Sequence, residues 1–279
     1  MSQAAIGTVY LNVSNLDKSL AFYQDIIGLQ IHRQEGKTTY LGAGADDLLA
    51  LNHTPNAPRV GGITGLYHFA ILLPSRAALA RSLKRLADTQ TPLQGLSDHY
   101  VSEAIYLADP EGNGIEIYRD RPRDNWYKNG QLDMGTVAMD VEGVMSAYYD
   151  EDTAWNGLPV GTIMGHIHLH VASVPKAEAF YRDLFGLDVL MNMGHATFMS
   201  YEGYHHHIGA NIWAGRTLPP DETILGLDKY VLRPPESVSV DSILGKLESA
   251  NVPFEEREEG YYLQDSSKIK ILLADKQQA

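Results

Sequence analysis

An internal repeat constrains the fold of this chain more than any other feature. Residues 13–29 read VSNLDKSLAFYQDIIGL and residues 171–187 read VASVPKAEAFYRDLFGL, an offset of 158 residues without gaps. In each copy the end of an alternating strand leads through a polar turn into a short amphipathic helix, which ends in Phe-Tyr and is stopped by glycine. Self-similarity of this kind is typical of a fold assembled from repeated units.

Two looser copies complete the pattern. One runs from a strand at His68 to a strand at residues 114–119, and the other runs from residue 228 to a strand at residues 269–273, each through an intervening helix. The chain is therefore predicted to have an α+β fold of four tandem βαβββ modules. Modules 1 to 4 are expected at residues 1–60, 61–122, 161–216 and 217–279, with a linker at residues 123–160.

A curled half-barrel made by one module cannot bury its inner face alone, so the modules should pair into two cups. The polar stretch at residues 121–152 has no clear periodicity, and no structure is assigned to it. Trp126 and Tyr127 within it are expected to pack against other residues. Trp213 is interpreted as a core residue in preference to a pocket wall.

Length and charge exclude several classes of protein. At 279 residues the chain exceeds the usual size of one domain. Its 22 basic and 35 acidic residues give a formal charge of −13 without a long basic run, which argues against nucleic-acid or anionic-membrane partners. The absence of cysteine excludes disulfides, zinc–thiolate sites and thiol nucleophiles. With no leader segment and no apolar stretch near the ~18 residues of a spanning helix, a soluble cytoplasmic protein is expected.

Two histidine-rich segments are the strongest chemical signals, GHIHLH at residues 165–170 and GYHHHI at residues 203–208. In a strand, His166, His168 and His170 would all project to one face. That face is either the interior of a cup or a solvated polar stripe, and three histidines together favour the interior. The repeat places His166 where module 1 has Thr8, and His68 heads its own first strand in the same way.

Glu116 stands between Ile115 and Ile117, which would face the opposite side of the strand. It is either a solubility residue on an edge strand or a carboxylate inside the cup, where it would be unfavourable unless paired or bound to a metal. Two histidines and one carboxylate form the ligand set that holds non-haem Fe(II) and leaves positions open for substrate and O2. Module 4 has no acid at the matching strand and no histidine at its start, so modules 1 and 4 are expected to be metal-free.

The segment at residues 203–208 is expected to be a strand. His205 and His207 would then face one side and His206 the other, so the three could not bind one ion together. A histidine close to a metal, but not bound to it, can act as a general acid or base.

With these residues in place, the chain resembles the vicinal oxygen chelate (glyoxalase/bleomycin resistance/dioxygenase) superfamily, and within it the extradiol catechol 2,3-dioxygenases. The helices ending in Phe-Tyr carry the superfamily pattern. More specific are the segment AIYLADPEGNGIE at residues 104–116, which resembles the family's tyrosine-to-ligand segment, and the His-His pair at residues 205–206. The resemblance implies the following roles: His68, His166 and Glu116 as metal ligands, His206 as acid/base, Tyr106 as a hydrogen-bonding partner of a substrate hydroxyl, and His99 as a looser match to a substrate-contacting histidine.

The order of the ligands departs from most two-domain relatives, in which the last two modules supply them. Here the module with one histidine is module 3, and the module with histidine and glutamate is module 2. A single site therefore predicts that module 2 pairs with 3 and module 1 with 4. If module 1 paired with 2 instead, the pocket would offer only Thr8, His68 and Glu116.

The reaction implied by the resemblance uses Fe(II), with Mn(II) as the alternative, to cleave catechol or a substituted catechol with O2. The product would be of the 2-hydroxymuconic semialdehyde type. A glyoxalase-like isomerase or lyase would favour a second carboxylate ligand and would not need His206. A non-enzymatic binding protein would need no triad of ligands. A homo-oligomer is compatible with the sequence, although no residue indicates one.

Overall fold

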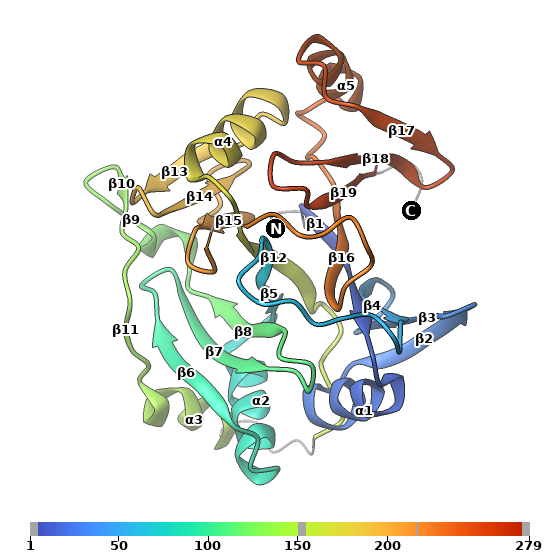
Figure 1. Cartoon of the computed structure of the whole chain (residues 1–279). Helices are drawn as coiled ribbons and strands as arrows, with labels where there is room; N and C mark the ends of the chain where they lie inside the picture. The colour runs from blue at the N-terminus through green and yellow to red at the C-terminus, as the bar shows by residue number, and fades with distance from the viewer. Residues whose placement is uncertain (1–4, 150–154, 216, 275–279) are drawn as a thin grey trace. The chain divides into compact units, whose positions relative to one another are not determined.

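The computed structural model describes residues 5–149, 155–215 and 217–274. Among these residues no helix combines the length and the apolar character needed to cross a membrane. Figure 1 shows the chain with its elements labelled in order.

Each module has the predicted order of one strand, one helical segment and three further strands. Module 1 comprises β1 (Ile6–Val13), α1 (Leu16–Ala21) continuing as η1 (Phe22–Ile27), β2 (Gln30–Glu35), β3 (Thr38–Gly42) and β4 (Asp47–His53). Module 2 comprises β5 (Gly65–Leu72), α2 (Arg76–Asp88), β6 (Leu93–Asp98), β7 (Ser102–Ala108) and β8 (Gly114–Asp120). Module 3 comprises β12 (Ile163–His170), α4 (Val174–Ala179) continuing as η3 (Phe180–Leu184), β13 (Asp188–Asn192), β14 (Ala196–Ser200) and β15 (Ile208–Asn211). Module 4 comprises β16 (Gly226–Leu232), α5 (Val240–Ser249), β17 (Phe254–Arg257), β18 (Gly260–Gln264) and β19 (Lys270–Leu273).

The strands form two large sheets. The eight-stranded sheet has the order β17-β18-β19-β16-β1-β4-β3-β2, and the nine-stranded sheet has the order β11-β6-β7-β8-β5-β12-β15-β14-β13. Strand β1 of module 1 pairs antiparallel with β16 of module 4, with Val9 opposite Tyr230. The predicted α+β fold is confirmed. In modules 2, 3 and 4 the first strand pairs in parallel with the last, as β5 does with β8.

The described chain divides into two compact units. Unit 1 contains the residues up to Asn12, Asn56–Tyr67 and the residues from Gly165 onward, and unit 2 contains Val13–Pro55 and His68–Met164. Unit 1 therefore holds most of modules 3 and 4, whereas unit 2 holds most of modules 1 and 2.

A tyrosine–carboxylate contact occurs once in each unit and explains the repeated Phe-Tyr. In unit 2 the Tyr23 hydroxyl donates to Asp109 at 2.7 Å, and in unit 1 the Tyr181 hydroxyl donates to Asp265 at 3.1 Å. Each carboxylate also accepts two backbone N–H bonds within its own turn. A buried carboxylate needs such partners, so the tyrosine at the end of one module's helix satisfies the turn of the next module. The glycine that follows each helix has the expected left-handed conformation, with φ of 91° at Gly28.

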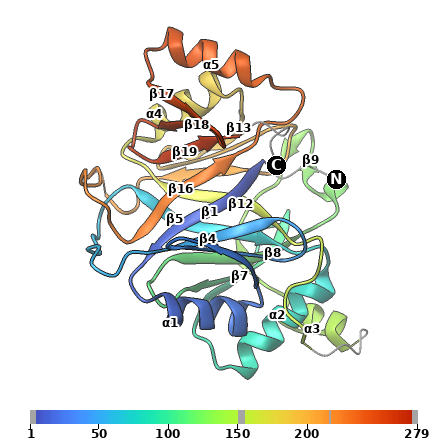
Figure 2. The same cartoon turned by 90° about the vertical axis from the view of Figure 1, so that its right-hand side faces the viewer.

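The region between modules 2 and 3 is more structured than the sequence indicated. It contains η2 (Arg123–Asn125), β9 (Tyr127–Lys128), β10 (Gln131–Leu132), β11 (Val137–Ala138) and α3 (Val141–Tyr149). Helix α3 packs beside α2, as both views show (Figures 1 and 2). Trp126 is buried as expected, and its indole N–H donates to the Arg121 carbonyl. Tyr127 is 39% exposed. The core assignment of Trp213 is wrong, because that side chain is 50% exposed.

Candidate metal centre

Two of the predicted ligands lie together in unit 2. His68 is on β5 and Glu116 is on β8, and the parallel register of these strands pairs Ala70 with Glu116. The Nε2 atom of His68 is 3.1 Å from Oε2 of Glu116, and both side chains are buried. Strand β8 lies between β7 and β5 in the sheet, so the alternative of an edge-strand solubility residue is wrong for Glu116.

Tyr106 and His99 extend this cluster. Tyr106 on β7 is directly opposite Glu116 on β8, so the ten positions that separate them in the sequence span one hairpin. The Tyr106 ring centroid is 5.7 Å from that of His68, and its hydroxyl oxygen is 2.7 Å from Nε2 of His99. The other ring nitrogen of His99, Nδ1, is 2.9 Å from the carbonyl oxygen of Gly135. Because a carbonyl only accepts, Nδ1 is assigned the proton, and Nε2 accepts the hydroxyl proton of Tyr106.

His166 lies in unit 1, on β12. It is 1% exposed, His168 is 4% exposed and His170 is half-buried, so the three do not form a solvated stripe. Asn211 contacts two of these three histidines. Its amide nitrogen is 3.0 Å from Nε2 of His168, and its oxygen is 2.7 Å from Nδ1 of His170. His168 and His170 therefore share a structural partner. The His166 ring instead lies 4.1 Å from the ring of His206, centroid to centroid.

The prediction of a strand at residues 203–208 was wrong. Strand β15 begins at Ile208, and residues 201–207 form a compact loop with positive φ at Glu202 and Gly203. All three histidines of the loop are buried, so none of them faces solvent. His207 accepts a backbone N–H bond from Tyr201 through Nδ1 at 3.1 Å, which identifies it as a structural residue of the turn.

His205 and His206 are in direct contact, with 2.9 Å between their Nδ1 atoms. One of these two atoms must carry a proton and the other must accept it. His206 also lies against the Phe198 ring, at 5.1 Å between centroids. The contact with His205 fixes the orientation of the His206 ring beside His166.

Asn211 and Gly135 could not be identified from the sequence. Each hydrogen-bonds a histidine that is 41 or 36 positions away along the chain. Such contacts depend on sheet register and on the path of a long connection, neither of which local periodicity reports.

The donor types of the buried side chains fit a divalent metal. His68, Glu116 and His166 are buried and each can supply one ligand atom. Neutral imidazole suits iron and related transition metals, and two histidines with one carboxylate suit non-haem Fe(II). The chemistry of these three residues is therefore compatible with the ion expected from the sequence.

Comparison with known proteins agrees with this chemistry. The model of the Glyoxalase/Bleomycin resistance protein/Dioxygenase superfamily matches residues 5–117. A catechol-2,3-dioxygenase of Bacillus subtilis (strain 168) is 43% identical over 268 residues, which cover 93% of this chain and 93% of that protein. The chain belongs to this superfamily. The predicted resemblance to extradiol enzymes and the prediction of a ring-cleaving dioxygenase are confirmed by this relative.

Other members of the superfamily are more distant. A lactoylglutathione lyase of Neisseria meningitidis serogroup A is 27% identical over 124 residues, which cover 41% of this chain and 90% of that protein. The crystal structure of glyoxalase I from Zea mays matches with a TM-score of 0.60 at 12% identity and covers 98% of this chain and 92% of that one. At that identity the likeness concerns the fold alone, because the superfamily fold hosts several reactions.

Proposed function

We propose that the chain is a metal-dependent extradiol dioxygenase, which cleaves catechol or a substituted catechol with O2 to a 2-hydroxymuconic semialdehyde-type product. The observation that carries the proposal is the buried His68–Glu116 pair with the Tyr106–His99 pair beside it. The name of the Bacillus subtilis relative, a catechol-2,3-dioxygenase, supports the same reaction.

His68, Glu116 and His166 are proposed to hold the metal, with Fe(II) as the expected ion and Mn(II) as the alternative. A bound ferrous ion would act as a Lewis acid toward the catechol oxygens and let electrons pass from substrate to O2. The carboxylate of Glu116 would balance part of the ionic charge. The two imidazoles add no charge of their own, so a catecholate anion could still be attracted to the site.

Tyr106 is proposed to orient a substrate hydroxyl and to relay its proton. Because His99 Nε2 takes the hydrogen bond from Tyr106, the phenol oxygen can accept one from a substrate hydroxyl. When the substrate proton moves to the Tyr106 oxygen, the Tyr106 proton can move to His99. The phenol then carries no full negative charge during the transfer, which favours proton removal in a buried site.

His206 is proposed to be the acid/base that returns a proton to an oxygen atom later in the reaction. Its Nδ1 is engaged by His205, so Nε2 is the atom assigned to proton exchange. Imidazole can donate and take back a proton near neutral pH, which suits a step that requires both. Its place next to His166 supports this role.

A glyoxalase-like isomerase or lyase is the main alternative, since one of the relatives is a lactoylglutathione lyase. Such an enzyme would favour a second carboxylate ligand. The proposed donor set contains one carboxylate, that of Glu116. The buried His206 next to His166 also has a ready use in oxygen chemistry, and both observations favour the dioxygenase.

The test is anaerobic loading with Fe(II), followed by catechol and air, with measurement of O2 uptake and of a yellow ring-opened product. Activity should be lost in His166→Ala and in Glu116→Gln. His170→Asn is the matched control, because His170 is on the same face of β12 and bonds to Asn211. It should retain activity.

Each negative result identifies a different error. Tight metal binding without catechol cleavage would favour the isomerase or lyase. Failure to bind Fe(II) or Mn(II) would refute the triad of ligands and favour a non-enzymatic binding protein. Full activity in Glu116→Gln would show that the carboxylate has been assigned wrongly.

A further inference from the structure

His99 is located in the tight connection between β6 and β7, at residues 99–101. The following residue, Tyr100, has φ of +67°, a left-handed conformation that is unfavourable for a residue with a side chain. The connection is held by Asp98, whose Oδ1 accepts the backbone N–H of Tyr100 at 2.8 Å. The backbone N–H of His99 in turn donates to the Ser102 carbonyl at 2.8 Å. The position of the His99 backbone therefore depends on the Asp98 carboxylate.

Asp98 is fixed in its turn by Arg121. The second carboxylate oxygen of Asp98 accepts from Nη2 of Arg121 at 2.5 Å. Burial alone would raise the pKa of Asp98, but the bonds from Arg121 and from the Tyr100 N–H outweigh it, and the pKa lies below its usual value. Asp98 is therefore ionised at neutral pH and keeps both bonds.

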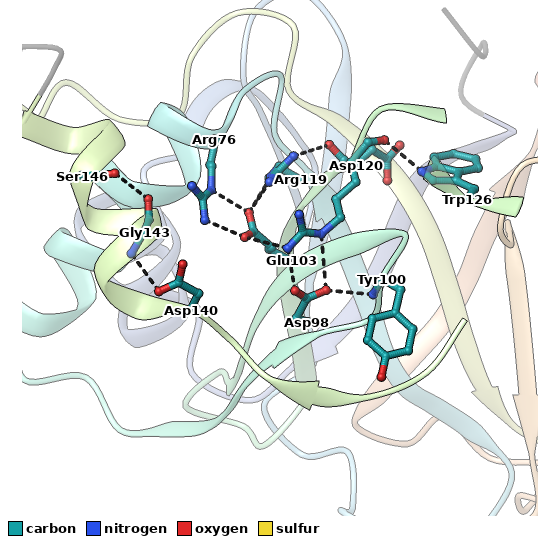
Figure 3. A network of polar contacts seen from close by, with 11 residues as sticks. Arg76, Asp98, Tyr100, Glu103, Arg119, Asp120, Trp126, Asp140, Gly143 and Ser146 are labelled. Carbon is teal, nitrogen blue, oxygen red and sulfur yellow. Dashed lines mark hydrogen bonds and ion pairs between the residues drawn. The ribbon is translucent and has the colours of Figure 1, made fainter. Parts of the chain in front are cut away.

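Arg121 is held by a buried carboxylate on the neighbouring strand. Glu103 is fully buried and directly opposite Asp98 in the β6–β7 hairpin, where two like charges would repel each other. Arg121 lies between them and also contacts Glu103 at 3.2 Å. Arg76 and Arg119 complete the cluster, with bonds of 2.8 and 2.7 Å to Glu103 (Figure 3). This anchoring makes the Arg121 guanidinium a rigid support.

We propose that Asp98 and Arg121 are positioning residues that hold the His99 imidazole against the Tyr106 hydroxyl, an inference that rests on the proposed function of His99 and Tyr106. The two side chains act through the backbone of the connection and not through a contact with the His99 ring. The ring is instead guided from two sides, by the Asp98-supported backbone and by the Gly135 carbonyl at Nδ1. Without the Asp98 bonds, Tyr100 would relax from its unfavourable conformation, and Nε2 of His99 would move away from Tyr106.

The decisive experiment compares Asp98→Ala with Asp47→Ala in the Fe(II)-loaded full chain. Asp47 is a matched control, because it also bonds an arginine and its side chain is 17% exposed, against 15% for Asp98. A reacting group misplaced by a fraction of an ångström reduces the rate strongly, so Asp98→Ala should lower kcat for catechol about tenfold. Its KM should change less than about twofold, and Asp47→Ala should keep the wild-type kcat. Asp98→Asn retains an acceptor for Tyr100 and should lose less activity.

A double-mutant comparison separates positioning from general loss of structure. In a His99→Gln background, Asp98→Ala should change kcat less than about twofold, because the group that it positions is already absent. An equal tenfold loss in both backgrounds, or wild-type kcat in Asp98→Ala, would overturn the proposal. If Asp98→Ala does not fold, Asp98→Asn and Arg121→Lys are compared in the same two backgrounds.

A measurement that does not need turnover separates this proposal from the proposed function. In the full chain labelled with nitrogen-15 at histidine, without added metal, His99 should show the Nδ1–H tautomer in the wild type and in Asp47→Ala. Asp98→Ala should show a mixture of tautomers. An unchanged tautomer in Asp98→Ala refutes the positioning role, whereas a wild-type enzyme inactive on catechol with the expected tautomer pattern refutes only the proposed reaction.

Discussion

The buried carboxyl of Asp265 should make the stability of the protein depend on pH in an unusual direction. Burial raises the pKa of Asp265 from 3.8 to about 6, although the N–H groups of Ile269 and Ser267 and the Tyr181 hydroxyl act to lower it. Between these two pH values the folded chain binds a proton that the unfolded chain has released. The contribution of this group to the unfolding free energy is therefore largest below pH 3.8. It decreases as the pH rises and is lost once the pH has passed about 6. The pKa difference corresponds to roughly 3 kcal/mol.

The assay is urea unfolding of the wild type and of Asp265→Asn at a series of pH values from about 4 to 7. An asparagine oxygen can still accept the two backbone N–H bonds that reach Oδ1 of Asp265. Its amide replaces the carboxylate oxygen that accepts the Tyr181 hydroxyl, and the free-energy cost of this change does not vary with pH over this range. The variant carries no titrating group there, so its unfolding free energy relative to the wild type should rise by about 2.4 kcal/mol across this range.

Taking the difference between the two proteins cancels the titration of all other groups that the substitution leaves unchanged. A constant difference across the pH range would refute the reasoning, since it would mean that Asp265 has the same pKa in the folded and unfolded chains. A difference that falls with pH would be a still stronger contradiction, because it would require the folded state to prefer the ionised carboxylate. Both proteins must also unfold in a single transition at every pH for the comparison to apply.

Three further predictions concern other contacts. Glu116→Gln should lower bound Fe(II) at least about tenfold, measured by metal analysis after dialysis, because the only carboxylate of the proposed donor set is lost; retention of metal would contradict the assignment. Tyr23→Phe should cost about 1–3 kcal/mol in urea unfolding, because Asp109 loses a buried partner; wild-type stability would show that the contact contributes nothing. Gly209→Ala should cost about 1–3 kcal/mol, since the added methyl would lie 2.8 Å from Cγ of His168; an unchanged melting temperature would show that the His168 ring moves aside freely.

The predicted pairing of the modules rests on a count of ligands. Only modules 2 and 3 carry histidines in their first strand, and one site needs both His68 and His166. The inward placement of Glu116 and Tyr106 followed from alternation and from one hairpin spacing, which are local properties of a strand. Successive side chains of a strand point to opposite faces, so the position of a residue along the strand is enough to predict the face on which it lies.

The features that could not be predicted depend on contacts between residues whose spacing in the sequence follows no regular period. The loop at residues 201–207 contains three consecutive histidines and reads as a strand, yet it turns at Glu202 and Gly203 and buries every ring. The Asp98–Arg121 contact joins residues 23 positions apart. The complete burial of Glu103 could not be predicted either, since burial of a carboxylate depends on the arginines that the fold brings to it.

Modules 2 and 4 share the register between their first and last strands but carry different side chains at the matching positions. In module 2, β5 and β8 pair His68 with Gly114 and Ala70 with Glu116. In module 4, β16 and β19 pair Lys229 with Lys270 and Val231 with Leu272 in the same parallel arrangement. The turn carboxylates fix this correspondence, because Asp109 precedes Glu116 by as many residues as Asp265 precedes Leu272.

The position of Glu116, a proposed ligand, is thus a buried leucine in module 4. The position of His68, the other proposed ligand of module 2, is a lysine whose ammonium lies 3.9 Å above the Tyr10 ring. A leucine provides no ligand atom, and an ammonium repels a cation. The tyrosine–carboxylate contact that holds the turn is nevertheless present in both units. The repeat therefore preserves the contacts that build the frame, while the proposed metal chemistry depends on the residues at two positions of the first and last strands.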